Sequence, residues 1–218
     1  MFFDDAKLAS SELDLVLTGK DCGQEERAPM CGVPFHSADS YMARLVAKGY
    51  KVAICEQMED TALAKGLVKR EVVRVLTPGT VIENSMLNEG RNNFLASVYF
   101  AGESAGVCFI DVSTGSVNLT ELAAPALPDK IINEIGRFMP SEIVFNSASS
   151  SLTKVFSFIS NKTEALAQEL GDNYFDPQSS AEIILKHFKK DSLSELELNE
   201  TGAAVSALGA ALKYLTEV

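Results

Sequence analysis

The carboxylate of Asp111 is the side chain best placed to take part in a metal-dependent reaction. It ends the apolar run Phe109-Ile110-Asp111, which is typical of a central strand, and two-metal nucleases gather such acids around their ions. A site of this kind needs two or three converging acids, and the next strand offers only Glu121, near its end. The string Asp-Val-Ser-Thr-Gly equally predicts a turn in which Asp111 accepts backbone N–H groups. The turn is the stronger interpretation, and a nuclease is kept as the alternative.

Basic side chains offer a second chemistry, the binding of phosphate groups. Lys69, Arg70 and Arg74 lie in or beside the run Glu71–Leu76, whose β-branched residues indicate a strand. Residues four apart on a strand face the same side, so Arg70 and Arg74 are expected to form a stripe, with Lys69 on the other face. Such groups position a protein on a duplex without reading its sequence. The other interpretation is a solvated edge strand that charge protects from aggregation.

The remaining nucleophilic and metal-binding residues form no recognisable catalytic set. His36 is expected to be a packed loop residue, and His187 to lie on a helix among lysines. A zinc site from Cys22, Cys31 and His36 would match no common ligand spacing. The sequence contains neither GxxxxGK[ST] nor GxGxxG, so the chain itself is expected to bind no nucleotide and to need no cofactor.

Composition limits the class of protein. The chain has 218 residues, 46% hydrophobic and 22% charged, which suits one large domain or two ordinary ones. It has neither a membrane-spanning run nor a secretory signal, and its four cysteines form no CxxC pair, so we expect a cytoplasmic protein with free thiols. The net charge of −11 is unusual for a nucleic-acid binder. The excess is uneven, because residues 1–80 hold 10 Lys/Arg and 12 Asp/Glu, whereas residues 81–218 hold 9 and 18.

Hydrophobic periodicity predicts a mixed α/β (α+β) chain in two parts. The first part alternates helices and strands, at Asp4–Leu13, Leu15–Thr18, Ala38–Val46, Lys51–Cys55 and Glu71–Leu76. The second part opens with a three-stranded meander, at Phe94–Phe100, Gly106–Val112 and Ser116–Leu122. Further helices and one strand follow, at Ile131–Phe138, Glu142–Phe145, from a capping box at Ser179 onward, and at Ala204–Leu215.

The domain boundaries follow from the polar stretch between these parts. We expect a mixed-sheet α/β domain at residues 1–82, a linker at residues 83–91, and a second domain at residues 92–218. A meander followed by alternating helices and strands favours a ribonuclease-H-like fold for the second domain. The last helix reaches the final residue with no stop signal, which favours a chain that continues into further domains.

Three long strings in the first part resemble a known family. They read FFDDAKLAS, APMCGVPFHSADSYMARLVAKGYKVAICEQMED and GLVKREVVRVLTPGT. These strings are similar to the start of bacterial MutS proteins, which find mispaired bases in DNA. From residue 90 onward the resemblance is weaker but collinear, through FIDVSTG and PSEIVF. The sequence is therefore identified as a member of the MutS family.

The resemblance implies a role for each part. Residues 1–82 would be most of a mismatch-recognition domain, and residues 92–218 a connector domain without nuclease activity. Family proteins are homodimers that kink double-stranded DNA at a mispair or small loop, exchange ADP for ATP with Mg²⁺, and recruit MutL. Their ATPase domain has no counterpart in these 218 residues, so the chain alone is expected to be no enzyme.

The resemblance also implies which residues face DNA. The family's Phe-x-Glu triplet, which wedges into the duplex and exploits the easier deformation of a mismatch, lies just upstream of the stretch that begins here at Met1. The chain alone is therefore expected to bind mismatches negligibly. Phe2 and Phe3 match apolar residues after the triplet and are expected to pack in the core. The residues that match the supporting shell, or flank it on the basic strand, are Met30, Pro29, Val33, Lys20, Arg70, Lys69 and Arg74.

Two other functions stay open. In the first, the acidic second part alone is the working unit of a MutS paralogue, as a protein-interaction module that docks MutL or relays nucleotide state. A ribonuclease-H-like nuclease built on Asp111 is the less favoured alternative.

Overall fold

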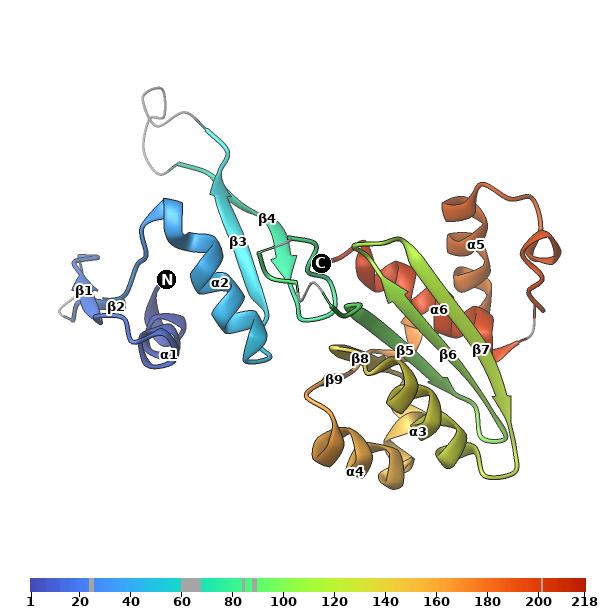
Figure 1. Cartoon of the computed structure of the whole chain (residues 1–218). Coiled ribbons are helices and arrows are strands. Elements are labelled where there is room, and N and C mark those ends of the chain that lie inside the picture. The colour runs from blue at the N-terminus through green and yellow to red at the C-terminus, as the bar shows by residue number, and fades with distance from the viewer. Residues whose placement is uncertain (24–25, 60–67, 84, 88–89, 201) are drawn as a thin grey trace.

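The computed structural model describes residues 1–23, 26–59, 68–83, 85–87, 90–200 and 202–218. Figure 1 shows two bodies, one blue to teal and one green to red, which meet where the teal end of the first lies beside the C-terminus. We call residues 1–82 the N-terminal region and residues 93–218 the C-terminal region. Among the described residues, no helix is both long and apolar enough to cross a membrane.

The C-terminal region is built on a five-stranded sheet. Its strand order is β7-β6-β5-β8-β9, in which β5, β6 and β7 form an antiparallel meander and β8 and β9 run parallel to β5. The strands are β5 (Phe94–Phe100), β6 (Ser104–Asp111), β7 (Ser116–Ala123), β8 (Glu142–Phe145) and β9 (Leu166–Glu169). This arrangement confirms the predicted ribonuclease-H-like fold. The predicted meander and the strand Glu142–Phe145 are both present.

Helices cover both faces of this sheet (Figure 1). They are α3 (Leu127–Phe138), α4 (Thr153–Lys162), α5 (Pro177–Phe188) and α6 (Ala203–Leu215). Because side chains alternate along a strand, Phe94, Ala96 and Val98 pack in the cluster with α3 and α4, whereas Leu95 packs on the side of α6. Short 3₁₀ turns complete the connections, at η2 (Ser147–Ser151), η3 (Asp172–Tyr174) and η4 (Leu193–Leu196).

Small residues let α6 lie very close to its neighbours. A Cβ atom added to Gly106 of β6 would stand 2.0 Å from the carbonyl oxygen of Ala203, at the start of α6. One added to Gly209 would stand 2.2 Å from the Cβ of Ser180 in α5. Every residue from Ala203 to Leu212 is buried, which makes α6 the central helix of this region.

The N-terminal region has less regular structure and a thinner core. Its elements are α1 (Phe3–Leu13), β1 (Thr18–Lys20), β2 (Ala28–Met30), η1 (Phe35–Ser37), α2 (Ala38–Ala47), β3 (Val52–Gln57) and β4 (Arg70–Leu76). The described strands form two separate antiparallel pairs, β1–β2 and β3–β4. One small cluster joins α1 and α2 through Ala6, Ala9, Leu13 and Leu45. A second joins α2 to the end of β4 through Val46, Leu76 and Val81.

Two sequence predictions about local structure were wrong, and some elements were missed. The strand expected at Leu15–Thr18 lies instead at Thr18–Lys20, because its partner is the short strand Ala28–Met30, where the sequence predicted no element. Ser179 does not cap α5, since Asp176 is the cap and its carboxylate accepts the backbone N–H of Ser179 at 2.8 Å. Helix α4 and strand β9 were not foreseen.

The sequence predicted that Phe2 and Phe3 pack in the core, and this prediction was wrong. Phe2 is 37% exposed and Phe3 is 62% exposed. Phe2 forms a β-bridge to Met30, and the buried face of α1 is made by Ala6, Ala9 and Leu13. The buried face of α1 therefore includes neither aromatic ring.

Candidate nucleic-acid interface

The β1–β2 pair gathers several of the residues that the sequence placed near DNA. Thr18 pairs with Met30, and Gly19 with Pro29, so Lys20, Pro29 and Met30 share one two-stranded ribbon. The chain start is fixed to the same ribbon, since the Met1 amino group donates to the Cys31 carbonyl at 3.0 Å.

The aromatic ring of Phe2 completes this cluster. The Nζ atom of Lys20 stands 5.7 Å from the centroid of that ring, within the range of a cation–π contact. Lys20 is exposed, whereas Pro29, Met30 and the following Val33 are half-buried. The ribbon therefore presents the Lys20 ammonium beside an apolar patch, a combination that suits a phosphate next to a base or sugar face.

Arg27 belongs to this ribbon and was missed by the sequence analysis. A Cβ atom on Gly19 would stand 3.0 Å from the Cβ of Arg27, so the arginine side chain lies across the glycine. Arg27 is exposed and directly precedes the strand that pairs with Lys20. The signal was present in the sequence only once β2 was known, because the pairing of β1 and β2 is what brings Arg27 beside Lys20.

The basic residues of β4 do not form the expected stripe. Arg70 pairs with Gln57 and Arg74 with Ile54, and a bulge at Val73 separates the two pairs. Gln57 and Ile54 are three residues apart on β3, so Arg70 and Arg74 face opposite sides of the ribbon. The prediction of a common face was wrong because an irregularity of one residue reverses the alternation.

Lys69, Arg70 and Arg74 also differ in whether an acidic side chain pairs with them. Arg74 is bound to the carboxylate of Glu83, and Lys69 to Glu71 at 2.5 Å. Burial alone would raise the pKa of Glu83, but the hydrogen bonds and charge of Arg74 hold that pKa below its ordinary value. Among the described residues, no acidic side chain pairs with the exposed Arg70. Arg70 is therefore the cation of β4 with the most charge to offer a partner.

The two basic groups are separate in space. Figure 1 shows β1 and β2 at one end of the N-terminal region and β4 near the C-terminal region, with α2 between them. The structure therefore joins Lys20, Pro29, Met30 and Arg27, and places Arg70 at a second position along the same region.

Comparison with known proteins covers both regions. The family model for MutS domain I matches residues 1–85, and that for MutS domain II matches residues 93–218. The chain belongs to the MutS family. The proteins named DNA mismatch repair protein MutS from Ruminiclostridium cellulolyticum and Lachnoclostridium phytofermentans are 49% and 46% identical to it, each over 99% of this chain. Those matches cover 24% and 23% of the relatives, so the chain spans about a quarter of their length.

A solved structure of Thermus thermophilus RuvC is also similar. The likeness covers 56% of this chain and 92% of that one, with 10% sequence identity and a TM-score of 0.41.

In this MutS-family chain the carboxylate of Asp111 is engaged by its own turn. Its Oδ1 accepts the backbone N–H of Ser113 at 3.0 Å and of Thr114 at 3.3 Å, and Asn92 donates to Oδ2 at 2.9 Å. Burial would raise the pKa of Asp111, but the hydrogen bonds from the Ser113 hydroxyl and from the backbone N–H groups of Thr114 and Ser113 hold it below its ordinary value. The turn interpretation is confirmed, and within the described ranges no three His, Cys, Asp or Glu side chains gather as a metal site.

The other candidate residues are dispersed. His36 is exposed beside Phe35, which is 90% exposed, so the expected packing of this loop was wrong. Cys22 is exposed, whereas Cys31 is buried and its thiol donates to the carbonyl of Ala6 at 3.4 Å.

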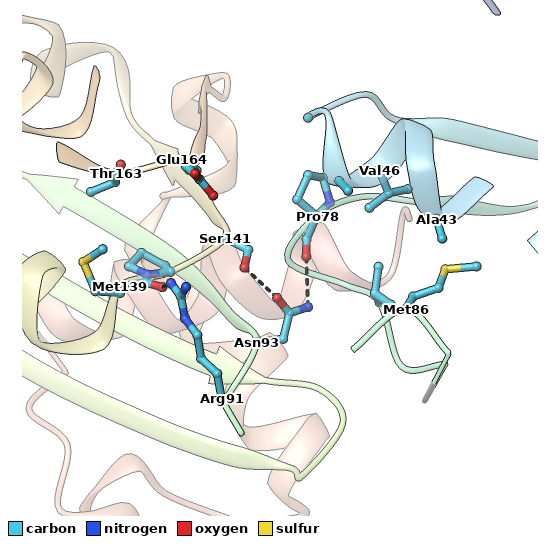
Figure 2. A pocket seen from close by; sticks show the side chains of 14 residues that line it. Ala43, Val46, Pro78, Met86, Arg91, Asn93, Met139, Ser141, Thr163 and Glu164 are labelled. Atoms are coloured by element: carbon cyan, nitrogen blue, oxygen red, sulfur yellow. Dashed lines mark hydrogen bonds between the residues drawn. The ribbon is translucent and has the colours of Figure 1, made fainter. Parts of the chain in front are cut away.

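A small cavity of about 180 Å³ lies between the two regions (Figure 2). Val46, Pro78 and Met86 line it from one side, and Met139 and Glu164 from the other. Asn93 bridges the regions at its floor, since its amide nitrogen donates to the Pro78 carbonyl at 2.9 Å and its amide oxygen accepts from Ser141 at 2.6 Å. The lining is mixed and offers no nucleophile with an adjacent base, so the cavity marks a junction.

Proposed function

We propose that this chain is the DNA-recognition and connector part of a protein that binds mispaired or looped duplex DNA and starts its repair. The observation that carries the proposal is the collinear match of both MutS domains to the two regions. We assign residues 1–82 to mismatch recognition, residues 83–91 to a linker and residues 92–218 to the connector.

The N-terminal region supplies the contacts to DNA in this proposal. Lys20 and Arg70 would bind phosphates, and Arg27 adds a third cation beside Lys20. Met30, with Pro29 and Val33, forms the apolar side of the ribbon and would support the DNA where it is deformed. Phosphate contacts of this kind give salt-dependent affinity without sequence information, and the selectivity for a mismatch comes from its easier deformation. Lys69 and Arg74 contribute less, because each has an acidic partner.

The remaining activities belong to the whole protein in this proposal. Homodimerisation, ATP and ADP exchange with Mg²⁺ and the recruitment of MutL would use the three quarters of the relatives' length that this chain does not span. The chain itself would position DNA and catalyse no reaction, in the cytoplasm of a bacterium.

A chimera tests the proposal directly. Residues 1–218 would replace the matching quarter of the Ruminiclostridium cellulolyticum MutS, and fluorescence anisotropy would compare a G·T heteroduplex with its matched homoduplex at one fixed salt concentration. Tighter binding to the heteroduplex supports mismatch recognition. Equal binding by a chimera that remains folded and dimeric would overturn it, and would favour a paralogue that uses the scaffold for another DNA structure.

Single substitutions in the chimera test the assigned residues. Lys20→Ala and Arg70→Ala should each weaken binding to both duplexes alike and lower the salt slope by about one. Lys162→Ala, at the end of α4 in the C-terminal region, is the matched control and should change neither quantity. Equal losses for all three lysine and arginine variants would show that the effect is non-specific charge.

A second candidate function rests on the charge of the C-terminal part. Residues 81–218 hold 9 Lys/Arg against 18 Asp/Glu, a balance that suits a basic protein surface better than a phosphate backbone. On this proposal the connector is a protein-interaction module. Cross-linking of the chimera to MutL, mapped to residues within 92–218, would support it, and cross-links confined to residues 1–82 would refute it.

A further inference from the structure

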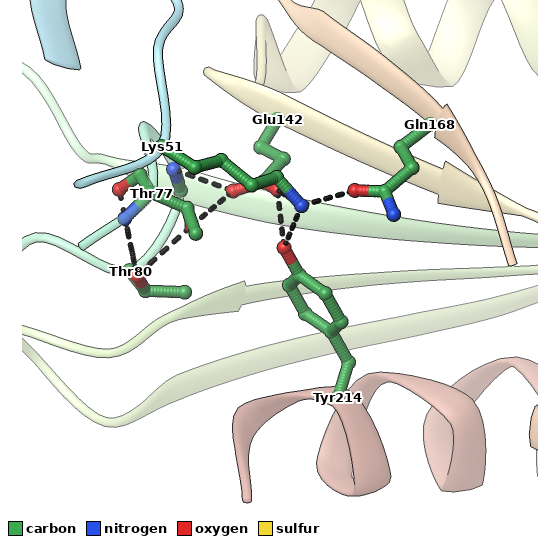
Figure 3. A network of polar contacts seen from close by, with 7 residues as sticks. Lys51, Thr77, Thr80, Glu142, Gln168 and Tyr214 are labelled. Atoms are coloured by element: carbon green, nitrogen blue, oxygen red, sulfur yellow. Dashed lines mark hydrogen bonds and ion pairs between the residues drawn. The ribbon is translucent and has the colours of Figure 1, made fainter. Parts of the chain in front are cut away.

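Among the residues that the structure describes, the carboxylate of Glu142 is the most thoroughly buried acid. Glu142 opens β8 in the C-terminal region, and its side chain is 0% exposed. A buried carboxylate is costly unless hydrogen bonds and charge compensate it. Figure 3 shows that the compensating groups come from both regions of the molecule.

One carboxylate oxygen of Glu142, Oε2, binds the turn Thr77–Thr80 at the end of the N-terminal region. It accepts the hydroxyl of Thr77 and the backbone N–H of Gly79, the latter at 3.0 Å. The turn is closed by Thr80, whose N–H donates to the Thr77 carbonyl at 3.1 Å. Thr77 is fully buried and Thr80 nearly so, and the turn lies against Glu142 and Leu95 of the C-terminal region.

The other carboxylate oxygen of Glu142, Oε1, contacts one side chain from α6 and one from the segment just before β3. The hydroxyl of Tyr214 donates to it at 2.6 Å, and the Nζ atom of Lys51 lies 3.7 Å away. Lys51 also donates to the Tyr214 hydroxyl at 2.8 Å and to the side chain of Gln168 in β9. Burial and the neighbouring carboxylate raise the pKa of Tyr214 far above its ordinary value, so its hydroxyl keeps its proton.

Gly79 makes the close approach of the turn possible. A Cβ atom at this position would stand 2.8 Å from the Cβ of Glu142 and 3.1 Å from the Cβ of Leu95. The backbone of Gly79 is not in the left-handed region, so space rather than conformation requires glycine here. An alanine would act as a wedge between the turn and β8 while leaving every hydrogen-bonding group in place.

Separation of the two regions would break this network in the most costly way. Glu142 would keep only Tyr214 as a hydrogen-bond donor, and Lys51 would lose its charged partner. Buried acceptors and charges left without partners cost far more than the net gain from making such bonds. The network therefore penalises any change in the angle between the regions.

We infer that Glu142 is a positioning residue that locks the N-terminal region onto the C-terminal region, by binding the Thr77–Thr80 turn and Lys51 at once. The angle at which Lys20 and Arg70 are presented is then set by a carboxylate in the other region. The inference concerns the geometry of the chain and stands or falls independently of DNA binding.

Distances between spin labels on the two regions test the inference. One label would sit on the exposed Cys55 of β3 and the other on Ser160→Cys of α4, with Cys22→Ser to remove the other exposed thiol. Cys31 and Cys108 are buried. Pulsed electron paramagnetic resonance would give the width of the distance distribution. Glu142→Ala and Gly79→Ala should each broaden that distribution at least twofold.

Matched controls separate positioning from stability. Glu182→Ala removes an exposed acid from α5, and Gly32→Ala adds a Cβ atom where nothing lies within 4 Å, so neither should broaden the distribution. If Glu142→Ala fails to fold, Thr77→Val keeps the side-chain volume and removes one donor, and it should broaden the distribution by a smaller amount. Glu142→Gln, which keeps one acceptor oxygen, should restore part of the narrow width.

The inference would be overturned by a lower melting temperature without broadening. Variants that keep the wild-type width at temperatures well below their melting point would show that Glu142 stabilises only its own region.

Discussion

The two regions of this chain solve the problem of burial differently. The C-terminal region encloses a sheet between two helical layers, and residues such as Leu95, Ile131 and Val205 are fully buried. The N-terminal region leaves large apolar side chains in solvent, including Val16 at 80% exposure and Phe35 at 90%. The difference shows that one region is stabilised by its own core, whereas the other depends on its neighbours for part of its stability.

The difference agrees with the proposed division of labour. A surface that meets DNA or another domain needs exposed apolar and basic groups, which cost stability while they are uncovered. A connector needs a fixed shape. The network around Glu142 is where the C-terminal region would stabilise the N-terminal region. The acceptor, Glu142, lies in the C-terminal region, and most of the groups that bind it lie in the N-terminal region.

Removing a phenylalanine ring from each region should give the largest contrast. Phe109 is 1% exposed and its ring stacks on Phe138 at a centroid distance of 4.1 Å. Phe109→Ala should therefore lower the free energy of unfolding by about 3–5 kcal/mol. Phe35→Ala, the same change at an exposed site, should alter it by less than about 0.5 kcal/mol. Urea unfolding followed by circular dichroism measures both, and equal losses would show that Phe35 is covered in solution.

Glycine substitutions sharpen the description of the C-terminal core. Gly209→Ala should destabilise by about 2 kcal/mol, since its Cβ would overlap Ser180 and force α5 away from α6. Gly136→Ala, in α3, should instead stabilise by about 0.5–1 kcal/mol, because the new Cβ has ordinary contact with Phe158 at 3.5 Å. Thermal unfolding of the two variants should move in opposite directions. A melting temperature that moved in the same direction for both variants would mean that α3 and α6 are packed equally tightly against their neighbours.

The fold of the C-terminal region was largely predictable from the sequence. Its strands carry near-continuous apolar runs such as Phe94–Phe100, separated by clear turn residues, and these patterns survive because burial on both faces demands them. The missed strand β9 has only four residues, and at the sheet edge it alternates between half-buried and exposed positions without a clear apolar pattern. In the N-terminal region β2 contains Pro29, which argues against a strand, so the ribbon with Lys20 was invisible in the sequence.

The candidate site was predictable as a set of residue types, and its arrangement was not. Lys20 and Arg70 came from family resemblance, and nothing in their spacing shows that they lie apart. The bulge at Val73 depends on the pairing of β3 with β4, and because of it Arg74 and Arg70 face opposite sides of the ribbon. The role of Glu142 was hidden for the same reason, because its donors are 63 to 72 residues away in the chain.

Acid should weaken the turn at Asp111 in the C-terminal region. Its pKa lies below the ordinary value of 3.8, so it adds stability at pH values above 3.8 that is lost as pH falls through the lowered value. Asp111→Asn should cost about 1.5 kcal/mol at pH 7, because two backbone N–H groups lose a charged acceptor. Urea unfolding at pH 7 and at pH 2 would measure the gap, with Asp191→Asn as the exposed control. If the difference in the free energy of unfolding between the wild type and Asp111→Asn persisted at pH 2, the asparagine amide would itself strain the turn.

The smallest expected effect concerns Glu12, which joins the two helices of the N-terminal region. Its carboxylate accepts the Lys48 ammonium at 2.7 Å and the Tyr50 hydroxyl at 3.0 Å, and the bond from Lys48, followed by that from Tyr50, lowers the pKa of Glu12. The Lys48 side chain is 46% exposed and that of Glu12 28% exposed, so water screens the pair and limits the gain. Since the pKa is depressed, the contribution is present above 4.5 and disappears as pH falls through the folded-state value.

Glu12→Gln tests this link through the exchange rates of backbone amides in α1. Faster exchange at neutral pH than in the wild type is expected, after correction for the pH dependence of the chemical rate, and the ratio should return to one in acid. Glu56→Gln, an exposed acid on β3, should leave α1 unchanged. If Glu12→Gln also quickened exchange in β5 and β6, the two regions would open as one cooperative unit, and the contrast between a self-sufficient region and a dependent one would have to be abandoned.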